Sequence, residues 1–241
     1  MNQALDGRTV LVTGANGGLG EHFVRQAVQR GAAKVYAAAR TGKEWNDTRI
    51  VPLTLDLTSP DDAERVAAEA RDVNLLINNA AVAPVGDSIT GPEEALRQIF
   101  ETNFFGTVRL ARAFTPVLAA HGGGTLLNVL SSAAWVPVPT GYGASKAALW
   151  SATNALRFQL RAQGTQVVAL LVGMIDTPMS ARWDVPKVSP ESVVAQAYDA
   201  VADGSIEVLA DDQTRYLKSR LNTKAEELYP WLGEQLAGFE A

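Results

Sequence analysis

Short apolar runs rich in β-branched residues alternate along this chain with longer segments in which apolar residues recur every three or four positions. The run at 9–13, for example, is followed by a segment that places Leu19, Phe23 and Ala27 on one side of a helix and stops at Gly31. Strands and helices that alternate in this way form a parallel sheet that is covered on both faces. The pattern therefore predicts an α/β fold.

Seven apolar runs fit the strands of such a sheet. They are 9–13, 34–40, 50–55, 73–77, 125–130, 165–172 and 206–209. Among the helices between them, one is expected to start with Ser59 as its N-cap, because proline follows it. A long amphipathic helix over 92–120 is interrupted in its pattern at 102–106, where asparagine and glycine are poor helix formers. The helix that contains Tyr142 is expected to run to about residue 163.

Composition narrows the classes of function. Apolar residues at 47% and charged residues at 20% describe a globular protein, and no linker-like run divides the chain, so we expect one domain over 1–241. The net charge of −5 and the scattered Arg and Lys give no reason to expect nucleic acid. Without cysteine and with two histidines, we expect neither thiol catalysis nor a protein-built metal site. We see no signal peptide and no membrane-spanning run, so we expect a cytoplasmic protein that does not contact membranes.

A glycine-rich turn follows the first predicted strand and opens the first helix. Gly14, Gly18 and Gly20 let backbone N–H groups approach a pyrophosphate, and a helix N-terminus favours its negative charge. A purely structural turn is the alternative. Because the turn has a strand before it and a helix after it, the sequence predicts a dinucleotide site.

The end of the second predicted strand indicates which dinucleotide. Folds that bind NAD carry an acidic residue about 20 residues after the glycines, whereas an arginine there suits a 2′-phosphate. This chain has Ala39, Arg40 and Thr41 at that place. A guanidinium can hold a phosphate as a fork, so Arg40 favours NADP(H). The alternative is an ordinary exposed arginine.

Polar residues stand at the ends of the next strands and within the long helix. Asp56 follows the third strand, on the ligand side of an open α/β sheet, and a carboxylate there could accept from an adenine amino group. Asn78 and Asn79 end the fourth strand and could contact a cofactor or support a turn. Asn103, if buried, needs partners, which backbone groups and an ordered water at a kink would supply. A structural role is the alternative for each asparagine.

Tyr142 and Lys146 lie four residues apart, so a helix brings them to one face. A phenol beside an ammonium can transfer protons, although such a pair is also common on ordinary helix surfaces. Ser131 and Ser132 follow the fifth strand, eleven and ten residues before the tyrosine.

Taken together, these motifs resemble the short-chain dehydrogenase/reductase family over about residues 9–179. The resemblance rests on Thr13-Gly14-x-x-x-Gly18-x-Gly20, Asn78-Asn79-Ala80, Asn103, a serine after the fifth strand and Tyr142-x-x-x-Lys146. It implies a single-domain Rossmann-type doubly wound parallel sheet in the order 3-2-1-4-5-6-7. It also implies a cofactor-binding part over about 7–130 and a catalytic and substrate-binding part over about 131–241.

The resemblance also implies roles for residues. Tyr142 would donate and accept the proton, Lys146 would lower the pKa of the tyrosine and bind the nicotinamide ribose, and Asn103 would help to hold a water chain. Ser131, rather than Ser132, is expected in the catalytic serine position. The expected cofactor-binding residues are Gly14, Asn16, Gly18, Leu19, Gly20, Arg40, Thr41, Asp56, Leu57, Asn79, Ala80, Ala81, Tyr142, Lys146, Gly173, Ile175 and Thr177.

Three departures from the family pattern accompany the motifs. The loop between the serines and Tyr142 is shorter than usual, Val172-Gly173 replaces Pro-Gly, and Ala81 replaces a glycine. The first leaves the serine position open between Ser131 and Ser132. The second is expected to leave the cofactor contacts of the following loop, through Ile175 and Thr177, intact.

The expected activity is NADPH-dependent carbonyl reduction or secondary alcohol oxidation, with donors ready for the negative charge that grows on the carbonyl oxygen. A cofactor-binding sensor or scaffold without catalysis and an NAD-linked alcohol dehydrogenase are the alternatives. We expect a small-molecule apolar ketone or secondary alcohol as substrate and a homodimer or homotetramer built through the helices that begin near Pro92 and Gly143. Seven residues are expected either to line the substrate pocket, open to bulky substrates, or to be core. They are Trp135, Val136, Pro137, Val138, Met179, Trp183 and Val185.

Overall fold

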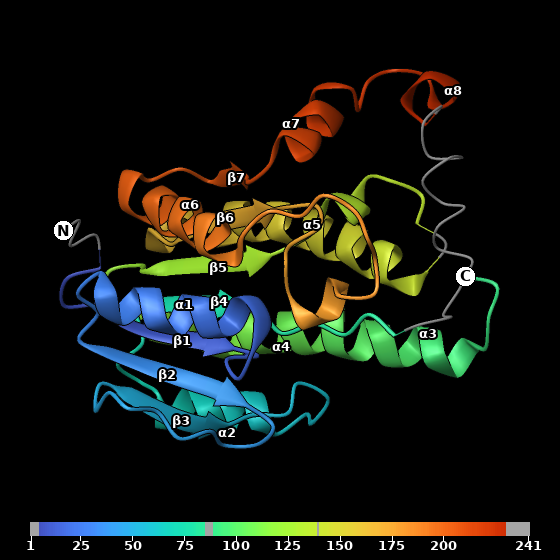
Figure 1. The fold of residues 1–241 in the computed structure, drawn as a ribbon. Coiled ribbons are helices and arrows are strands. Elements are labelled where there is room, and N and C mark those ends of the chain that lie inside the picture. Colours follow the sequence, from blue (N-terminus) through green and yellow to red (C-terminus); the bar gives the residue numbers. More distant parts are fainter. Residues whose placement is uncertain (1–4, 85–88, 139, 230–241) are drawn as a thin grey trace.

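Within residues 5–84, 89–138 and 140–229, which the computed structural model describes, seven parallel strands form one sheet. The strands are β1 (Thr9–Thr13), β2 (Lys34–Ala39), β3 (Ile50–Thr54), β4 (Leu75–Asn78), β5 (Thr125–Val129), β6 (Gln166–Leu171) and β7 (Glu207–Leu209). Their order is β3-β2-β1-β4-β5-β6-β7 (Figure 1). The predicted fold class and strand order are confirmed.

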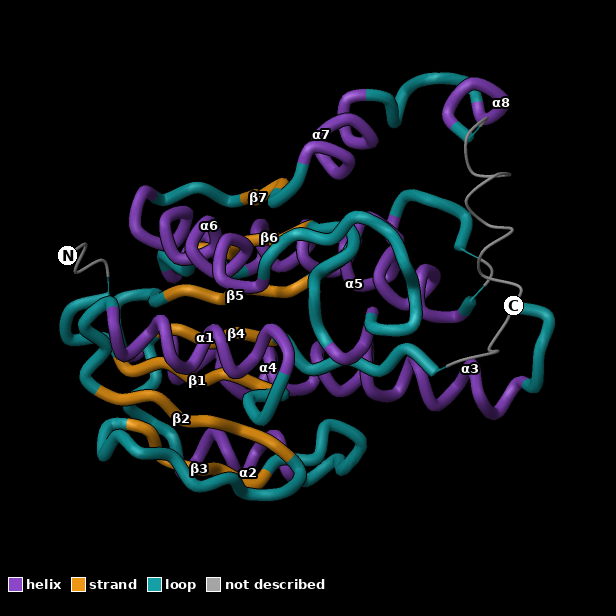
Figure 2. The backbone as a smooth tube through the Cα atoms, viewed as in Figure 1, coloured by secondary structure: helices purple, strands orange, loops and turns teal. Residues whose placement is uncertain are grey.

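Helices cover both faces of the sheet (Figure 2). One face carries α1 (Gly18–Gln29) and α6 (Pro190–Asp203), and the other carries α2 (Asp62–Glu69), α4 (Thr107–Ala120) and α5 (Gly141–Gln159). Three further helices are α3 (Glu93–Phe100), α7 (Asp212–Ser219) and α8 (Ala225–Leu228). Among the described residues, no helix is long and apolar enough to cross a membrane.

Alternate side chains of each strand enter different cores. Val10 and Val12 pack with Phe23 of α1 on one side of β1, whereas Leu11 packs with Phe114 of α4 on the other, and all five are fully buried. This two-residue period follows from the pleat of a strand. Burying one such side chain contributes about 1.5–3 kcal/mol to folding, so both faces hold the sheet in place.

The predicted start of α2 is wrong by a few residues. Ser59 does not cap the helix, which begins at Asp62. Instead, the Ser59 backbone N–H donates to the carbonyl oxygen of Asp56 (3.1 Å), and the Asp56 carboxylate accepts from the N–H (2.9 Å) and hydroxyl (2.8 Å) of Thr58. Such local side-chain bonds compete with helix formation, and they hold a turn where a helix was expected.

The long helix predicted over 92–120 is confirmed, with a specific irregularity. α3 and α4 are joined without a break by a π-helical turn over Glu101–Gly106. The predicted interruption at 102–106 falls within this turn. Single π-helical turns inside α-helices occur frequently at functional sites. The helix with Tyr142 ends earlier than predicted, at Gln159, and a 3₁₀ turn over Arg161–Gln163 leads to Gly164.

Candidate functional site

The carboxyl-terminal ends of the parallel strands bring most of the predicted site residues to one edge of the sheet. The glycine turn follows β1, Arg40 follows β2, Asn79 follows β4, Ser131 follows β5 and Gly173 follows β6. Ligands of open α/β sheets bind outside this edge, near the point where strand order reverses. In this sheet β1 and β4 are the two neighbouring strands at that point.

The glycine turn is packed so closely that it excludes side chains. Gly14 has φ +66°, which favours glycine. A Cβ at Gly20 would lie 2.0 Å from the carbonyl oxygen of Gly14, well inside van der Waals contact. Among the described residues, no side chain caps the N-terminus of α1, so its first backbone N–H groups are open to an anion. The turn fits a pyrophosphate.

Asn79 ties β4 to this turn. Its side-chain amide donates to the carbonyl oxygen of Thr13 (2.8 Å), and the Thr13 hydroxyl accepts from the backbone N–H groups of Asn79 (2.9 Å) and Ala80 (3.0 Å). Ala80 also lies against Gly14. Of the two interpretations left open for Asn79, these contacts support the structural one, since its amide orders the turn. Ala81 follows directly and is partly exposed.

The end of β2 is drawn to the glycine turn by Asn16, whose amide donates to the carbonyl oxygen of Thr41 (2.6 Å). Arg40 therefore lies next to the turn. Its side chain is exposed and forms no ion pair with any residue in the described part of the chain. An exposed guanidinium beside a dinucleotide turn fits a 2′-phosphate.

Asp56 and Leu57 are held in the turn that follows β3. One carboxylate oxygen of Asp56 accepts from the backbone N–H and the hydroxyl of Thr58, as is usual for an aspartate in a turn. Leu57 is buried, and its carbonyl oxygen accepts from the Arg109 guanidinium of α4 (2.9 Å). The contact of Asp56 with an adenine remains a prediction.

Lys146 lies inside the protein, with 2% of its surface exposed. Its Nζ donates to the carbonyl oxygen of Val129, the last residue of β5, at 2.7 Å. The same Nζ lies 5.6 Å from the centre of the Tyr142 ring. The predicted pairing of these two residues on one face of a helix is thus present. Burial disfavours the ammonium and lowers the pKa of Lys146 to about 8.

The pKa of Tyr142 differs from expectation. Burial raises it above its ordinary value, and a hydrogen bond from the Ser131 side chain only partly opposes that effect. The sequence led us to expect a lowered pKa because of Lys146. The protein groups alone do not lower it, because desolvation dominates.

Ser131 is the serine that contacts Tyr142. Its hydroxyl also accepts from the Ala133 backbone N–H (3.1 Å), which starts a short 3₁₀ turn over Ser132–Ala134. Both serines are 8% exposed, so burial does not distinguish them, but the contact with the phenol does. The structure brings Ser131, Tyr142 and Lys146 together.

Asn103 is fully buried in the π-helical turn and is hydrogen-bonded at both ends of its amide. The oxygen accepts from the backbone N–H of Val82 (2.8 Å), and the nitrogen donates to the Val82 carbonyl (3.0 Å) and to the Ser145 hydroxyl (3.1 Å). Ser145 in turn donates to the carbonyl oxygen of Tyr142 (2.7 Å). Asn103 therefore links the loop after β4 to the first turn of α5. Sequence reasoning missed Ser145, although its place between Tyr142 and Lys146 was a signal.

The loop after β6 returns to the glycine turn. A Cβ at Gly18 would lie 3.7 Å from two side-chain carbons of Thr177, so Thr177 borders the predicted pyrophosphate site. The Ser180 hydroxyl donates to the carbonyl oxygen of Ile175, which holds the loop in a tight turn. At the start of the loop, the Gly173 backbone N–H donates to the carboxylate of Asp211 (2.7 Å). Nothing in the local sequence indicated Asp211, which lies 38 residues from Gly173.

Of the two alternatives left open for the seven apolar residues, burial supports the core for Trp135. Trp135 is buried and packs edge-to-face on Trp150 at 5.8 Å, and Val136 packs against the same core cluster. Trp135 belongs to the core because α5 and α7 cover it, whereas Val136 is only partly buried beside it. Met179 and Val185 are 46% and 41% exposed, and these two remain available to a ligand.

The other three residues proposed for the pocket are Trp183, Pro137 and Val138. Trp183 stacks with Arg182 (4.0 Å from the guanidinium to the ring centre), Pro137 is exposed, and Val138 lies against Gly143. No group of three or more His, Cys, Asp or Glu side chains that could hold a metal ion occurs within the described ranges.

Comparison with known proteins identifies the family. The family model for short chain dehydrogenases matches residues 8–187. The chain is 32% identical over 236 residues to a 1-deoxy-11-beta-hydroxypentalenate dehydrogenase of Streptomyces exfoliatus, covering 88% of this chain and 86% of that protein. It is 33% identical over 201 residues to a dehydrogenase/reductase SDR family member 4 of Bos taurus, covering 76% and 71%.

A solved structure is similar as well. A short chain dehydrogenase from Burkholderia cenocepacia J2315 in complex with NADP superposes with a TM-score of 0.87 and 34% identity, covering 94% of this chain and 97% of that one. The chain therefore belongs to the short-chain dehydrogenase/reductase family, whose members are oxidoreductases acting on CH–OH groups. The resemblance stated from its motifs is confirmed.

Proposed function

We propose that this protein is an NADPH-dependent carbonyl reductase, or in the reverse direction a secondary alcohol dehydrogenase. The observation that carries the proposal is the hydrogen bond between the Ser131 hydroxyl and Tyr142, whose ring lies 5.6 Å from the buried ammonium of Lys146. Two hydroxyl donors that meet at one point can both bind a single carbonyl oxygen. A protein that only bound the cofactor would have no need of this arrangement.

The residues present fit NADP(H). Gly14, Gly18 and Gly20 leave room for the pyrophosphate, and Arg40 is free to bind a 2′-phosphate. Gly173, Ile175 and Thr177 would hold the nicotinamide end. The similar Burkholderia enzyme was solved with NADP, which supports the same choice of cofactor. Eight further residues are proposed as cofactor contacts around these positions. They are Asn16, Leu19, Thr41, Asp56 and Leu57, with Asn79, Ala80 and Ala81 beside the turn.

The chemistry divides between cofactor and protein. When bound, the dihydronicotinamide supplies a hydride to the carbonyl carbon of the substrate. Tyr142 gives its proton to the carbonyl oxygen, so that ketone, hydride and proton become an alcohol, and Ser131 stabilises the negative charge that grows on that oxygen. In alcohol oxidation Tyr142 accepts the proton instead. Lys146 would bind the nicotinamide ribose, and Asn103 fixes the first turn of α5 on which the tyrosine stands.

A raised pKa of Tyr142 suits reduction better than oxidation. The phenol stays protonated over a wide range of pH, so it is ready to donate. Oxidation needs the phenolate, and only positive charge from Lys146 and the cofactor would supply the stabilisation that the protein groups alone lack.

The proposed substrate is a small-molecule apolar ketone or secondary alcohol, because Met179 and Val185 present apolar surface beside the loop after β6. We also propose that the protein is a homodimer or homotetramer. Phe105 in the π-helical turn and Phe158 near the end of α5 are 51% and 80% exposed, an exposure that a second copy of the chain would remove. The cytoplasmic location stays a prediction.

The test is a reduction assay with a matched variant. Purified protein is incubated with NADPH and a panel of aliphatic, cyclic and aryl ketones while the absorbance of reduced cofactor is followed. We expect turnover with at least one ketone, and we expect Tyr142→Phe to lower kcat by about 10²–10⁴-fold while NADPH still binds. Tight NADPH binding without turnover on any ketone or alcohol would favour the sensor or scaffold. An equal preference for NADH and NADPH would favour an NAD-linked enzyme.

A further inference from the structure

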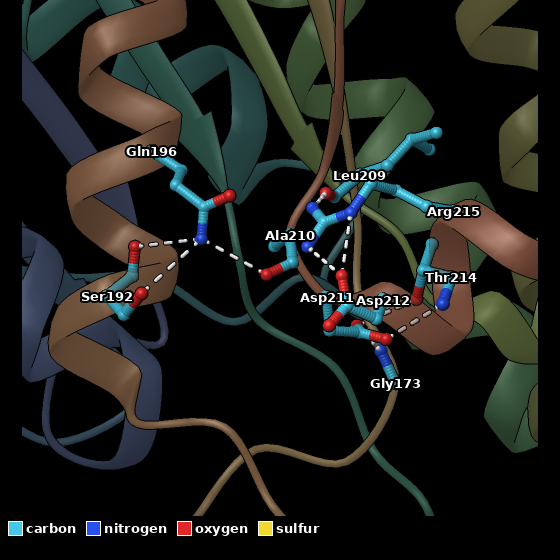
Figure 3. Close-up of polar contacts among 9 residues, drawn as sticks. All are labelled: Gly173, Ser192, Gln196, Leu209, Ala210, Asp211, Asp212, Thr214 and Arg215. Carbon is cyan, nitrogen blue, oxygen red and sulfur yellow. Dashed lines mark hydrogen bonds and ion pairs between the residues drawn. The ribbon is translucent and has the colours of Figure 1, made fainter.

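The carboxylate of Asp211 is almost fully buried, with 8% of the residue exposed, at the junction between β7 and α7. Each of its two oxygens accepts from a backbone N–H group. One accepts from Thr214 in the first turn of α7 (2.8 Å), and the other accepts from Gly173 in the loop after β6 (2.7 Å) and from the Thr214 hydroxyl (2.7 Å). Figure 3 shows the carboxylate between the helix and the loop.

We propose that Asp211 is a positioning residue for the nicotinamide end of the cofactor site. Gly173 is two residues before Ile175 and four before Thr177, and these are the residues expected to hold the nicotinamide carboxamide. Fixing the Gly173 N–H therefore fixes where that loop begins. This inference rests on the proposed function, since it concerns the same cofactor.

The far end of the loop is fixed separately. Val188 donates its N–H to the carbonyl oxygen of Met174 (2.9 Å) and accepts from the Asp176 N–H (3.0 Å), so a short bridge joins the far end of the loop to residues near its start. Among the described residues, no backbone carbonyl accepts from the Gly173 N–H. Asp211 supplies that partner, and the loop is then held at both ends.

The anchor itself is rigid. The carbonyl oxygen of Ala210, next to Asp211, accepts from the Gln196 amide of α6 (3.1 Å; Figure 3). At the other end of α7, Leu217 is buried in a core cluster, and Lys218 pairs with Glu207 of β7 at 2.9 Å. Because α6 and α7 hold Asp211 in place, its carboxylate fixes the start of the cofactor loop relative to these two helices.

Space is tight at the junction as well. A Cβ on Gly173 would lie 3.3 Å from the Gln213 side chain and 3.6 Å from each oxygen of Asp211. The loop thus approaches α7 as closely as a glycine permits. Contact this close explains why the carboxylate can reach a backbone N–H of a distant loop.

Asparagine in place of Asp211 separates the two functions of the carboxylate. The side chains have the same shape, but asparagine offers one oxygen to two backbone donors. Asparagine is also a good helix N-cap, so its oxygen can keep the Thr214 N–H and leave the Gly173 N–H unpaired. Asp211→Asn is therefore expected to release the loop while α7 stays capped.

The control is Asp212→Asn, one residue further along. Asp212 is exposed and its side chain pairs only with Arg215 among the described residues (2.8 Å). Both substitutions remove one negative charge from the first turn of the same helix. They differ in the contact with Gly173.

We expect Asp211→Asn to raise the Kd and KM for NADPH about tenfold, the effect of losing one buried hydrogen bond, with a smaller change in kcat. The Gly173 amide is expected to exchange hydrogen faster in this variant and at the wild-type rate in Asp212→Asn. The inference is overturned if both variants bind NADPH equally well and protect Gly173 equally. If the wild-type protein itself neither binds NADPH nor reduces ketones, the proposed function fails, while Gly173 exchange still tests the anchor.

Discussion

The ammonium of Lys146 donates to the carbonyl oxygen of Val129 at 2.7 Å, which fastens α5 to the end of β5. Both groups are buried, so the Lys146 ammonium loses its hydration when it forms this bond. The pKa of Lys146 at about 8 records that cost. A buried lysine ammonium lowers the stability of the fold, and strongly shifted pKa values of this kind are concentrated at functional sites.

The cost should appear as a pH dependence of stability. The pKa of Lys146 is about 8 in the folded protein and ordinarily 10.5, so between those values the unfolded chain binds more protons and stability rises with pH. Between pH values of about 7.5 and about 9.5, we expect the free energy of unfolding of the wild type to rise by about 2 kcal/mol relative to Lys146→Met. Urea denaturation of both proteins at each pH measures the difference. Parallel curves would show that the lysine is not desolvated.

The serine position can be decided by two single substitutions. Ser131 contacts Tyr142, and Ser132 is equally buried one residue later. We expect Ser131→Ala to lower kcat by about 10²-fold, because a donor to the carbonyl oxygen is lost, and Ser132→Ala to change it much less. Steady-state reduction of one ketone by both variants is the measurement. Equal losses of kcat in the two variants would contradict the assignment of Ser131, rather than Ser132, as the donor to the carbonyl oxygen.

The glycine turn makes a prediction about stability. Gly20→Ala places a Cβ 2.0 Å from the Gly14 carbonyl oxygen, so we expect a loss of about 1–3 kcal/mol of unfolding free energy. Gly17 in the same turn has extended backbone and open space around it, and Gly17→Ala should cost less than about 1 kcal/mol. Thermal and urea unfolding of the pair compare them directly. A Gly20→Ala protein as stable as the Gly17→Ala protein would mean that the turn can rearrange.

Arg40 is expected to select between cofactors. Arg40→Ala should raise the KM for NADPH about 10- to 100-fold, because a charged hydrogen bond to the 2′-phosphate is lost, and leave the KM for NADH unchanged.

Arg97 provides the control for that substitution. It is an exposed arginine of α3 whose side chain pairs with Glu93. Arg97→Ala should change neither KM. If Arg40→Ala weakened NADPH and NADH equally, the guanidinium would be acting on a part that both cofactors share.

Much of this site follows from the sequence because its signals are local. A strand, three spaced glycines and a helix predict the dinucleotide turn. The four-residue separation of Tyr142 and Lys146 places both on one helix face, as the structure confirms. The place of Arg40 can also be predicted from local sequence, because it follows β2 and the carboxyl ends of parallel strands lie at one edge of the sheet. These features need only the periodicity of a strand or helix.

The tertiary structure decided what depends on residues far apart. Desolvation raised the pKa of Tyr142. Packing against Trp150 of α5 and Leu217 of α7 buried Trp135 in the core rather than in a pocket. The contact that distinguishes Ser131 from Ser132, and the hydrogen bond that the Gly173 N–H donates to Asp211, likewise join segments that no short pattern relates. Sequence determined which groups are present at the sheet edge; folding alone determined which of them meet and how dry their surroundings are.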